Sequence, residues 1–165
     1  MNAEAANRGS RKTTIKMKYF TIKELTASTK AKSMGIDNTP TPEVVANLTA
    51  LVEAILDPLR IRYGHPIIVS SGYRCPRLNR AVGGSATSQH VKGEAADIYV
   101  TRPKEMAELF ALIYYTLPFD QLIWERGNDE APAWIHVSYD GDNRRECLRY
   151  DGKSYQPYKP TKRWK

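Results

Sequence analysis

A histidine and an aspartate with the spacing of metal ligands stand near the middle of the sequence. The stretch "SQHVKGEAADI", residues 88–98, places His90 and Asp97 seven positions apart with Gly93 between them. Gly93 permits a sharp backbone reversal, which would direct both side chains toward one point. Asp97 begins an apolar run, where a carboxylate is costly unless another group pairs with it. The stretch therefore predicts half of a metal site, and the other half must come from elsewhere in the chain.

His136 is the best candidate for that other half, because the 165-residue chain has three histidines in all. The segment "AWIHVSY" reads as a strand in which His136 shares one face with Trp134 and Ser138, while the apolar residues between them point to the core. His65 lies beside a proline in "YGHPI", at the end of a predicted helix, and is interpreted as a loop histidine.

His90, Asp97 and His136 together make a set of two imidazoles and one carboxylate. Catalytic zinc sites use three protein ligands of these types and leave a fourth position for water, which the metal makes more acidic. A structural cluster held by hydrogen bonds is the alternative that the spacing leaves open.

The net charge of +7 is concentrated at the two ends of the chain. Residues 1–18 contain five Lys/Arg and one acid, and residues 144–165 contain eight Lys/Arg and two acids. A basic surface that reads nucleic acid should lie on the folded body, so we expect no nucleic-acid partner. We expect an N-terminal extension without fixed structure over 1–18, one domain over 19–150 and a basic tail over 151–165. The tail either binds an anionic surface or only aids solubility.

The sequence has no apolar run of the roughly 18–20 residues that cross a membrane, and its N-terminus lacks the apolar core of a signal peptide. We expect a soluble monomer that is made in the cytoplasm and has no export signal of its own. Cys75 and Cys147 are too sparse for a disulfide scaffold and are interpreted as two free thiols.

The remaining pattern predicts an α+β domain with an antiparallel sheet and flanking helices. "TIKE" has the form of a capping box, so a helix should begin at Thr21, and Thr41 followed by Pro42 should begin a second helix that Pro58 kinks or ends. The other expected elements are a strand over 67–70, helical turns over 76–82, a strand over 97–100, a helix over 103–115, and a hairpin of strands 119–125 and 133–139.

Three motifs carry a resemblance to a known family. "SGYR", then "SQHVKGEAAD", then "WIHVSY" resemble the zinc D-alanyl-D-alanine carboxypeptidase family of murein peptidases, which shares its fold with the hedgehog N-terminal domain. The resemblance covers roughly residues 20–139 and is strongest to the small, phage-like branch that includes endolysins. The matching positions are Ser88, His90, Gly93, Ala95 and Asp97 in the second motif, and Trp134 and His136 in the third.

The resemblance implies one Zn²⁺ ion bound by His90, Asp97 and His136. It also implies that Arg74 binds a substrate carboxylate or orients the scissile carbonyl, with Ser88 and the neighbouring Tyr73 contributing to substrate binding. An arginine suits that role because its planar, permanently charged fork matches a carboxylate. An ordinary ion pair between Arg74 and a nearby acid is the alternative.

The general base is where the sequence departs from the family pattern, because many relatives carry a glutamate at the position of Ala133. Glu125, at the end of the preceding strand in "LIWE", is the nominated base, and Glu130 in the intervening loop is its rival. A site without a protein base is the third alternative. If Glu125 lies opposite Trp134, then Glu125 and His136 share a face of the hairpin. A register shift of one residue would turn Glu125 away.

The implied activity is zinc-dependent hydrolysis of peptide bonds that involve D-amino acids in peptidoglycan stem peptides, by a carboxypeptidase or an endopeptidase acting at the bacterial cell wall. Two alternatives stay open. One is a zinc-binding cell-wall module without catalysis, and the other is a nucleic-acid-binding protein that uses its basic ends.

Overall fold

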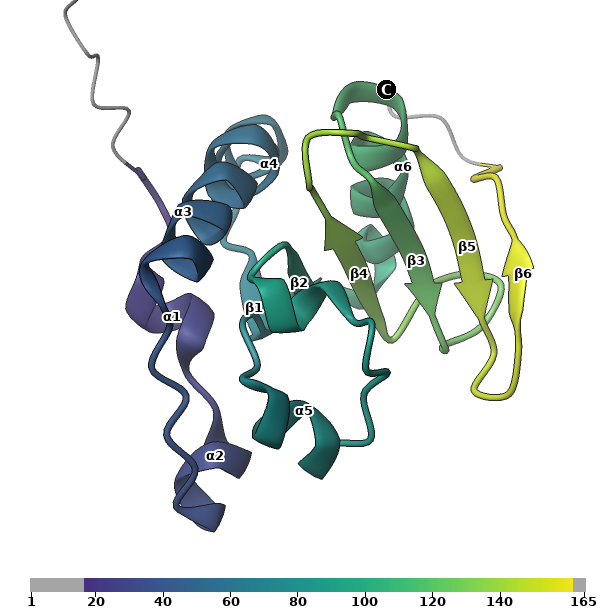
Figure 1. Cartoon of the computed structure of the whole chain (residues 1–165). Coiled ribbons are helices and arrows are strands. Elements are labelled where there is room, and N and C mark those ends of the chain that lie inside the picture. Colours follow the sequence, from purple (N-terminus) through teal and green to yellow (C-terminus); the bar gives the residue numbers. More distant parts are fainter. Residues whose placement is uncertain (1–16, 162–165) are drawn as a thin grey trace, which may run out of the picture.

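A computed structural model describes residues 17–161 (Figure 1). Most of the predicted N-terminal extension, residues 1–16, lies outside the described residues. Six α-helices and three short π- or 3₁₀-helical segments of the described chain surround one six-stranded mixed sheet, so the domain is α+β as the sequence predicts. None of the helices of residues 17–161 has both the length and the apolar character needed to cross a membrane.

The first two helices begin at side-chain caps. Thr21 caps α1 (Ile22–Thr26) by accepting a hydrogen bond from the Glu24 N–H, as the capping box predicts. The sequence did not predict α2 (Thr29–Met34), which Ser28 caps in the same way and which ends at Gly35 in the left-handed conformation.

Pro58 does not end the second predicted helix. Thr41 caps α3 (Pro42–Leu51), which continues without a break through the π-helical segment η1 (Val52–Leu56) into α4 (Asp57–Tyr63). Proline lacks an N–H and its ring clashes with the carbonyl four residues earlier, so a regular α-helix cannot run through it. The wider π-turn just before Pro58 accommodates the ring without ending the helix.

The six strands form one sheet in the order β1-β2-β4-β3-β5-β6. Their bounds are β1 Ile68–Ser71, β2 Ala95–Tyr99, β3 Gln121–Glu125, β4 Trp134–Ser138, β5 Glu146–Tyr150 and β6 Tyr155–Pro157. All neighbouring strands are antiparallel except β3 and β5, which are parallel. The predicted α+β fold with flanking helices is therefore confirmed, and the pairing of β3 with β5 is the one parallel step in the otherwise antiparallel sheet of residues 17–161.

The helix predicted over 103–115 consists of the 3₁₀ turn η3 (Pro103–Glu105) followed by α6 (Met106–Thr116). α6 lies behind the sheet in Figure 1, and its buried side chains join those of α3, η1 and α4 in one core. Apolar residues of the strands complete this core from the same side. The opposite face of β2, β4 and β3 is left for polar side chains.

The C-terminal segment differs most from expectation. Residues 151–165 were expected to be a basic tail, but β6 lies within them and pairs with β5 at the far edge of the sheet (Figure 1, yellow). Tyr158 then packs its ring against Phe110 and Trp124. The sequence analysis also did not predict β5, although "ECLRY" alternates so that Glu146, Leu148 and Tyr150 share one face of a strand.

Candidate metal centre

A short helical turn carries the first predicted ligand into the domain. Pro76–Ala81 forms α5, and after it Ser88 caps the 3₁₀ segment η2 (Gln89–Lys92) by accepting a hydrogen bond from the His90 N–H. Gly93 ends the turn in the left-handed conformation, with a φ of 74°, at the position where the sequence predicted a sharp backbone reversal. A Cβ at Gly93 would lie 2.9 Å from the carbonyl oxygen of Val44, so a side chain has no room there either.

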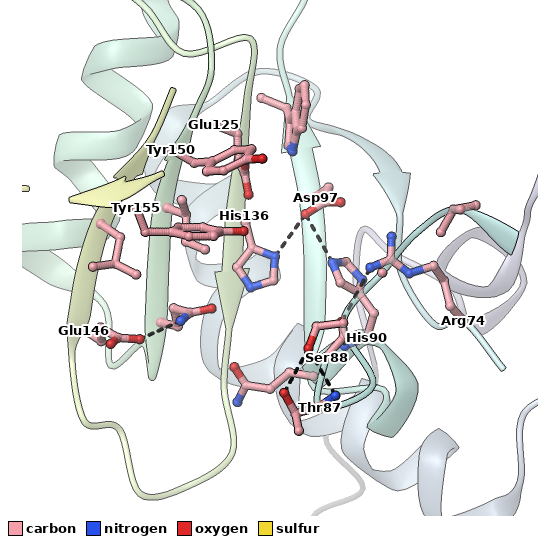
Figure 2. A pocket seen from close by; sticks show the side chains of 18 of the residues that line it. Arg74, Thr87, Ser88, His90, Asp97, Glu125, His136, Glu146, Tyr150 and Tyr155 are labelled. Atoms are coloured by element: carbon pink, nitrogen blue, oxygen red, sulfur yellow. Dashed lines mark hydrogen bonds and ion pairs between the residues drawn. The ribbon is translucent and has the colours of Figure 1, made fainter. Parts of the chain in front are cut away.

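The sheet register brings the other two ligands together. The sequence predicted that Asp97 would be the first residue of a strand. It is instead the third residue of β2, and it pairs directly with His136 of β4. Asp97 Oδ1 lies 3.2 Å from His90 Nε2 and 3.1 Å from His136 Nδ1 (Figure 2). Potential ligand atoms of all three residues lie within 4.8 Å of one another.

Gly72 fixes the tautomer of His90. The Nδ1–H of His90 donates a 2.7 Å hydrogen bond to the Gly72 carbonyl oxygen, which can only accept. In a neutral His90 the lone pair of Nε2 therefore faces the carboxylate of Asp97, so that two acceptors meet. A divalent cation resolves this conflict, and second hydrogen bonds of this kind are typical of histidines that bind metals.

His136 adds a second signal of the same kind. Its Nε2 atom is buried and has no hydrogen-bond partner among the described residues, while its Nδ1 faces Asp97. Burial raises the pKa of Asp97, but the interactions of its carboxylate with His90 and His136 outweigh burial and hold that pKa well below its usual range. The three side chains therefore fit a metal ion such as Zn²⁺, which prefers imidazole and carboxylate ligands.

Glu125 lies in the same cavity as the three ligands, and Glu130 does not line it. Glu125 pairs with Trp134 across the hairpin and Ile123 pairs with His136, so the register condition for a shared face is met. Burial is the main cause that raises the pKa of Glu125 to about 7, with the nearby Asp97 charge adding to it and His136 opposing it. Glu130 is exposed in the loop after Asn128.

Arg74 also lines this cavity, half-buried on the opposite side from Glu125 (Figure 2). Its guanidinium makes long contacts of 3.4 Å to Ser71 Oγ and 3.5 Å to Ser88 Oγ, and its Nε is buried without a partner. Within residues 17–161 no carboxylate forms an ion pair with it, so the ordinary ion pair considered from the sequence is not formed there.

Tyr73 is the one predicted site residue that the structure places away from the cavity. Its side chain is 6% exposed and packs in the hydrophobic core, and it does not line the cavity. The residue before Arg74 must face the opposite way along an extended segment, so the two side chains cannot both enter the site. This placement argues against direct contact between Tyr73 and the substrate.

The cavity, hereafter the cleft, has a volume of about 720 Å³ and runs across the sheet from Arg74 to β6. Sequence reasoning missed much of its lining, because it placed the working residues before position 140. The additional side chains come from β3, β5 and β6 and the loop before β5; they include Gln121, Ile123, Arg144, Glu146, Leu148, Tyr150 and Tyr155. Gly72, which orients His90, was missed as well, although it lies in the "SGYR" motif.

The two cysteines lie outside the cleft lining and are not bonded to each other. Cys147 is on β5, and burial raises the pKa of its thiol to about 12. A thiol of that pKa stays protonated at neutral pH and is a poor nucleophile or metal ligand.

A sheet that carries two histidines and an aspartate in a cleft, with a carboxylate and an arginine beside them, is the type of site found in metal-dependent hydrolases. The sequence matches the family model described as Peptidase M15 over residues 18–138, which is more than half of the chain. The chain therefore belongs to this family and is a metallopeptidase of a zinc-dependent family. Comparison with curated proteins gives no significant match.

Proposed function

We propose that this protein hydrolyses peptide bonds that involve D-amino acids in peptidoglycan stem peptides, with one zinc ion held by His90, Asp97 and His136. The observation that carries the proposal is that potential ligand atoms of two histidines and one aspartate lie within 4.8 Å of one another, next to a buried carboxylate in the same cleft. The His90–Gly72 hydrogen bond supports it, because it leaves the Nε2 lone pair of a neutral His90 facing Asp97, as metal binding requires.

A zinc ion held there would supply Lewis-acid charge beside the scissile carbonyl and would lower the pKa of water. Glu125 is the proposed general base, which takes a proton from the attacking water and passes it to the leaving amine. A base with a pKa near 7 is suited to both transfers at neutral pH, because neither protonation state is strongly favoured.

Arg74 is the proposed anion-binding residue. Burial lowers the pKa of Arg74 from its usual value, but an arginine stays charged at any pH at which the protein works. Its guanidinium has no carboxylate partner in the described chain and can therefore bind the substrate carboxylate or the negative charge that develops on the carbonyl oxygen. Ser88, whose hydroxyl lies 3.5 Å from the guanidinium, orients it.

The substrate class rests on the family resemblance and on the mixed charge of the cleft, whose lining includes Arg74, Arg126 and Arg144 together with Asp97, Glu125 and Glu146. Arg144 is paired with Asp120 and Glu146, so its charge is not free for a phosphate backbone. A zinc-binding module without catalysis needs no carboxylate with a raised pKa beside the metal, and the presence of Glu125 there favours an enzyme.

The test is metal analysis of the purified protein together with digestion of purified peptidoglycan by the wild type, His136→Ala and Glu125→Gln. We expect about one zinc per wild-type chain and new amino termini only with the wild type. Glu125→Gln should keep its zinc and lose at least about 100-fold in rate. Equal release of amino termini by wild type and His136→Ala would sink the zinc mechanism.

A further inference from the structure

The part of the cleft farthest from Arg74 is built by β5 and β6, which lie outside the family match over residues 18–138. Leu148, Tyr150 and Tyr155 of these strands line the cleft together with the proposed metal ligands. These three side chains belong neither to the metal centre nor to the proposed general base. They indicate a binding surface, because Tyr155 is 55% exposed, one of the larger apolar exposures in the described chain.

The sheet register carries the site face continuously to this edge. Residues that pair directly on neighbouring strands point to the same face. One row runs through Trp134, Glu125, Tyr150 and Tyr155, each paired with the next. The two tyrosines therefore stand on the face that carries the proposed base, and they stand directly beside it.

The two tyrosines are held in place before any ligand arrives. Their rings stack with centroids 4.4 Å apart and an angle of 26° between the planes. The Arg126 guanidinium lies 5.7 Å from the Tyr150 ring centroid, and the Arg126 N–H donates to the Tyr150 carbonyl oxygen. Figure 2 shows both hydroxyl groups directed toward His136 and Asp97. A preorganised pair of this kind binds a ligand without an ordering cost.

We propose that Tyr150 and Tyr155, the tyrosine wall, bind the part of the substrate that lies on the N-terminal side of the cleaved bond. This inference rests on the proposed function. Arg74 stands at the opposite end of the cleft, beyond the metal ligands, and its guanidinium, which forms no ion pair within residues 17–161, attracts the C-terminal, negatively charged side of a peptide. The N-terminal side must then extend across β3 and β5 toward β6.

The dimensions set the length of substrate that this wall can hold. Neighbouring strands lie about 4.8 Å apart, so the three steps from β4 to β6 span about 14 Å, which is about four residues of extended peptide. Tyrosine suits such a peptide, because its ring packs against aliphatic side chains while its hydroxyl donates to a backbone carbonyl. The enzyme should therefore prefer stem peptides with several residues before the cleaved bond and should cleave short peptides poorly.

The first test measures length dependence. The bond cleaved in a full stem peptide is located by mass spectrometry, and N-acetylated peptides that keep this bond are then shortened one residue at a time from the N-terminal side. For the wild type we expect kcat/KM to be at least about tenfold lower for a peptide with one residue on the N-terminal side than for a peptide with three or more residues there. Cleavage that leaves fewer than two residues on the N-terminal side, or a dependence on length only on the C-terminal side, would overturn the proposal.

The second test assigns the preference to the wall. Tyr155→Ala should bring the ratio of kcat/KM for long and short peptides close to one, and Tyr155→Phe, which keeps the stack but not the hydroxyl, should give an intermediate ratio. Tyr19→Ala is the matched control, because Tyr19 is also exposed, at 41%, and does not line the cleft. If Tyr155→Ala keeps the wild-type ratio, the wall does not bind substrate.

Binding gives a readout that does not depend on turnover. In the zinc-loaded Glu125→Gln protein, calorimetry should show that Tyr155→Ala weakens binding of the full stem peptide about tenfold. If the wild type cleaves the peptide but Tyr155→Ala changes neither binding nor the ratio, only the tyrosine wall fails. If the wild type neither cleaves nor binds any stem peptide, the proposed function fails and this inference fails with it.

Discussion

The raised pKa of Glu125 predicts that this carboxylate destabilises the metal-free protein at neutral pH. Its pKa rises from 4.5 to about 7 on folding, chiefly because the group is buried. A group with a raised folded-state pKa contributes stability that is fully present below its unfolded pKa, here 4.5, and is lost as pH rises through 7. Glu125→Gln removes this titration, so the variant should gain stability relative to wild type as pH rises.

The magnitude follows from linkage. Each unit of pKa shift corresponds to 1.36 kcal/mol, and these two pKa values would make the difference grow by about 2.5 kcal/mol between pH 5 and pH 8. Water in the cleft screens the carboxylate in part, so we expect about 2 kcal/mol. The assay is urea unfolding of the chelator-treated proteins at both pH values, followed by the fluorescence of the buried Trp124.

Glu130→Gln is the matched control, since Glu130 is exposed and does not line the cleft. Its effect on the free energy of unfolding should be the same at pH 5 and pH 8. A wild-type minus Glu125→Gln difference that is flat between the two pH values would refute the argument that Glu125 is buried as a high-pKa acid. The same result would weaken its nomination as the base, because the pKa near 7 is what suits it to that role.

Three further predictions concern the metal ligands, the arginine and the turn. Asp97→Asn should lower zinc affinity at least about 100-fold, measured by competition with a chromophoric chelator, and unchanged affinity would remove Asp97 from the site. Arg74→Ala should lower kcat/KM about 100-fold and Arg74→Lys should recover part of it, whereas full activity of Arg74→Ala would mean that no anion binds there. Gly93→Ala should lower the free energy of unfolding in urea by about 2–4 kcal/mol, because the position combines a positive φ with a clash against Val44. Gly83→Ala is the control and should lower it by only about 1 kcal/mol, because Gly83 has a φ of 75° but open space around it. Equal losses for the two variants would show that the clash at Gly93 is relieved.

Local sequence signals predicted the elements that depend on local physics. The caps at Thr21 and Thr41 start helices where the side-chain oxygen can satisfy a free N–H of the first turn. The alternation in "AWIHVSY" predicted β4 because apolar side chains on one face of the strand alternate with His136 and Ser138 on the other. Pro58 shows the limit of such signals, since packing of the helix on the core favours a π-turn over a break.

The C-terminal strands could not be predicted in the same way. β5 pairs with β3 in parallel, and a parallel partner is not marked by a turn in the sequence as a hairpin partner is. β6 is an edge strand of three residues with all of its side chains exposed, so it lacks the hydrophobic pattern that identifies a strand. The composition of the segment, rich in lysine and arginine, described its charge correctly and its structure wrongly.

By itself the sequence determined which side chains could hold a metal, because histidine is scarce here and Gly93 marks the one turn that brings His90 toward Asp97. It also determined the family, through motifs that lie within residues 18–138. Only the tertiary structure decided the orientation of His90 by the Gly72 carbonyl, the register that turns Glu125 into the cleft, and the tyrosine wall on β5 and β6. The His90–Gly72 contact and the pairing of β5 with β3 join segments far apart in the chain, which leaves no local pattern in the sequence. The β3–β4 register depends on the conformation of the hairpin loop, which the sequence leaves open.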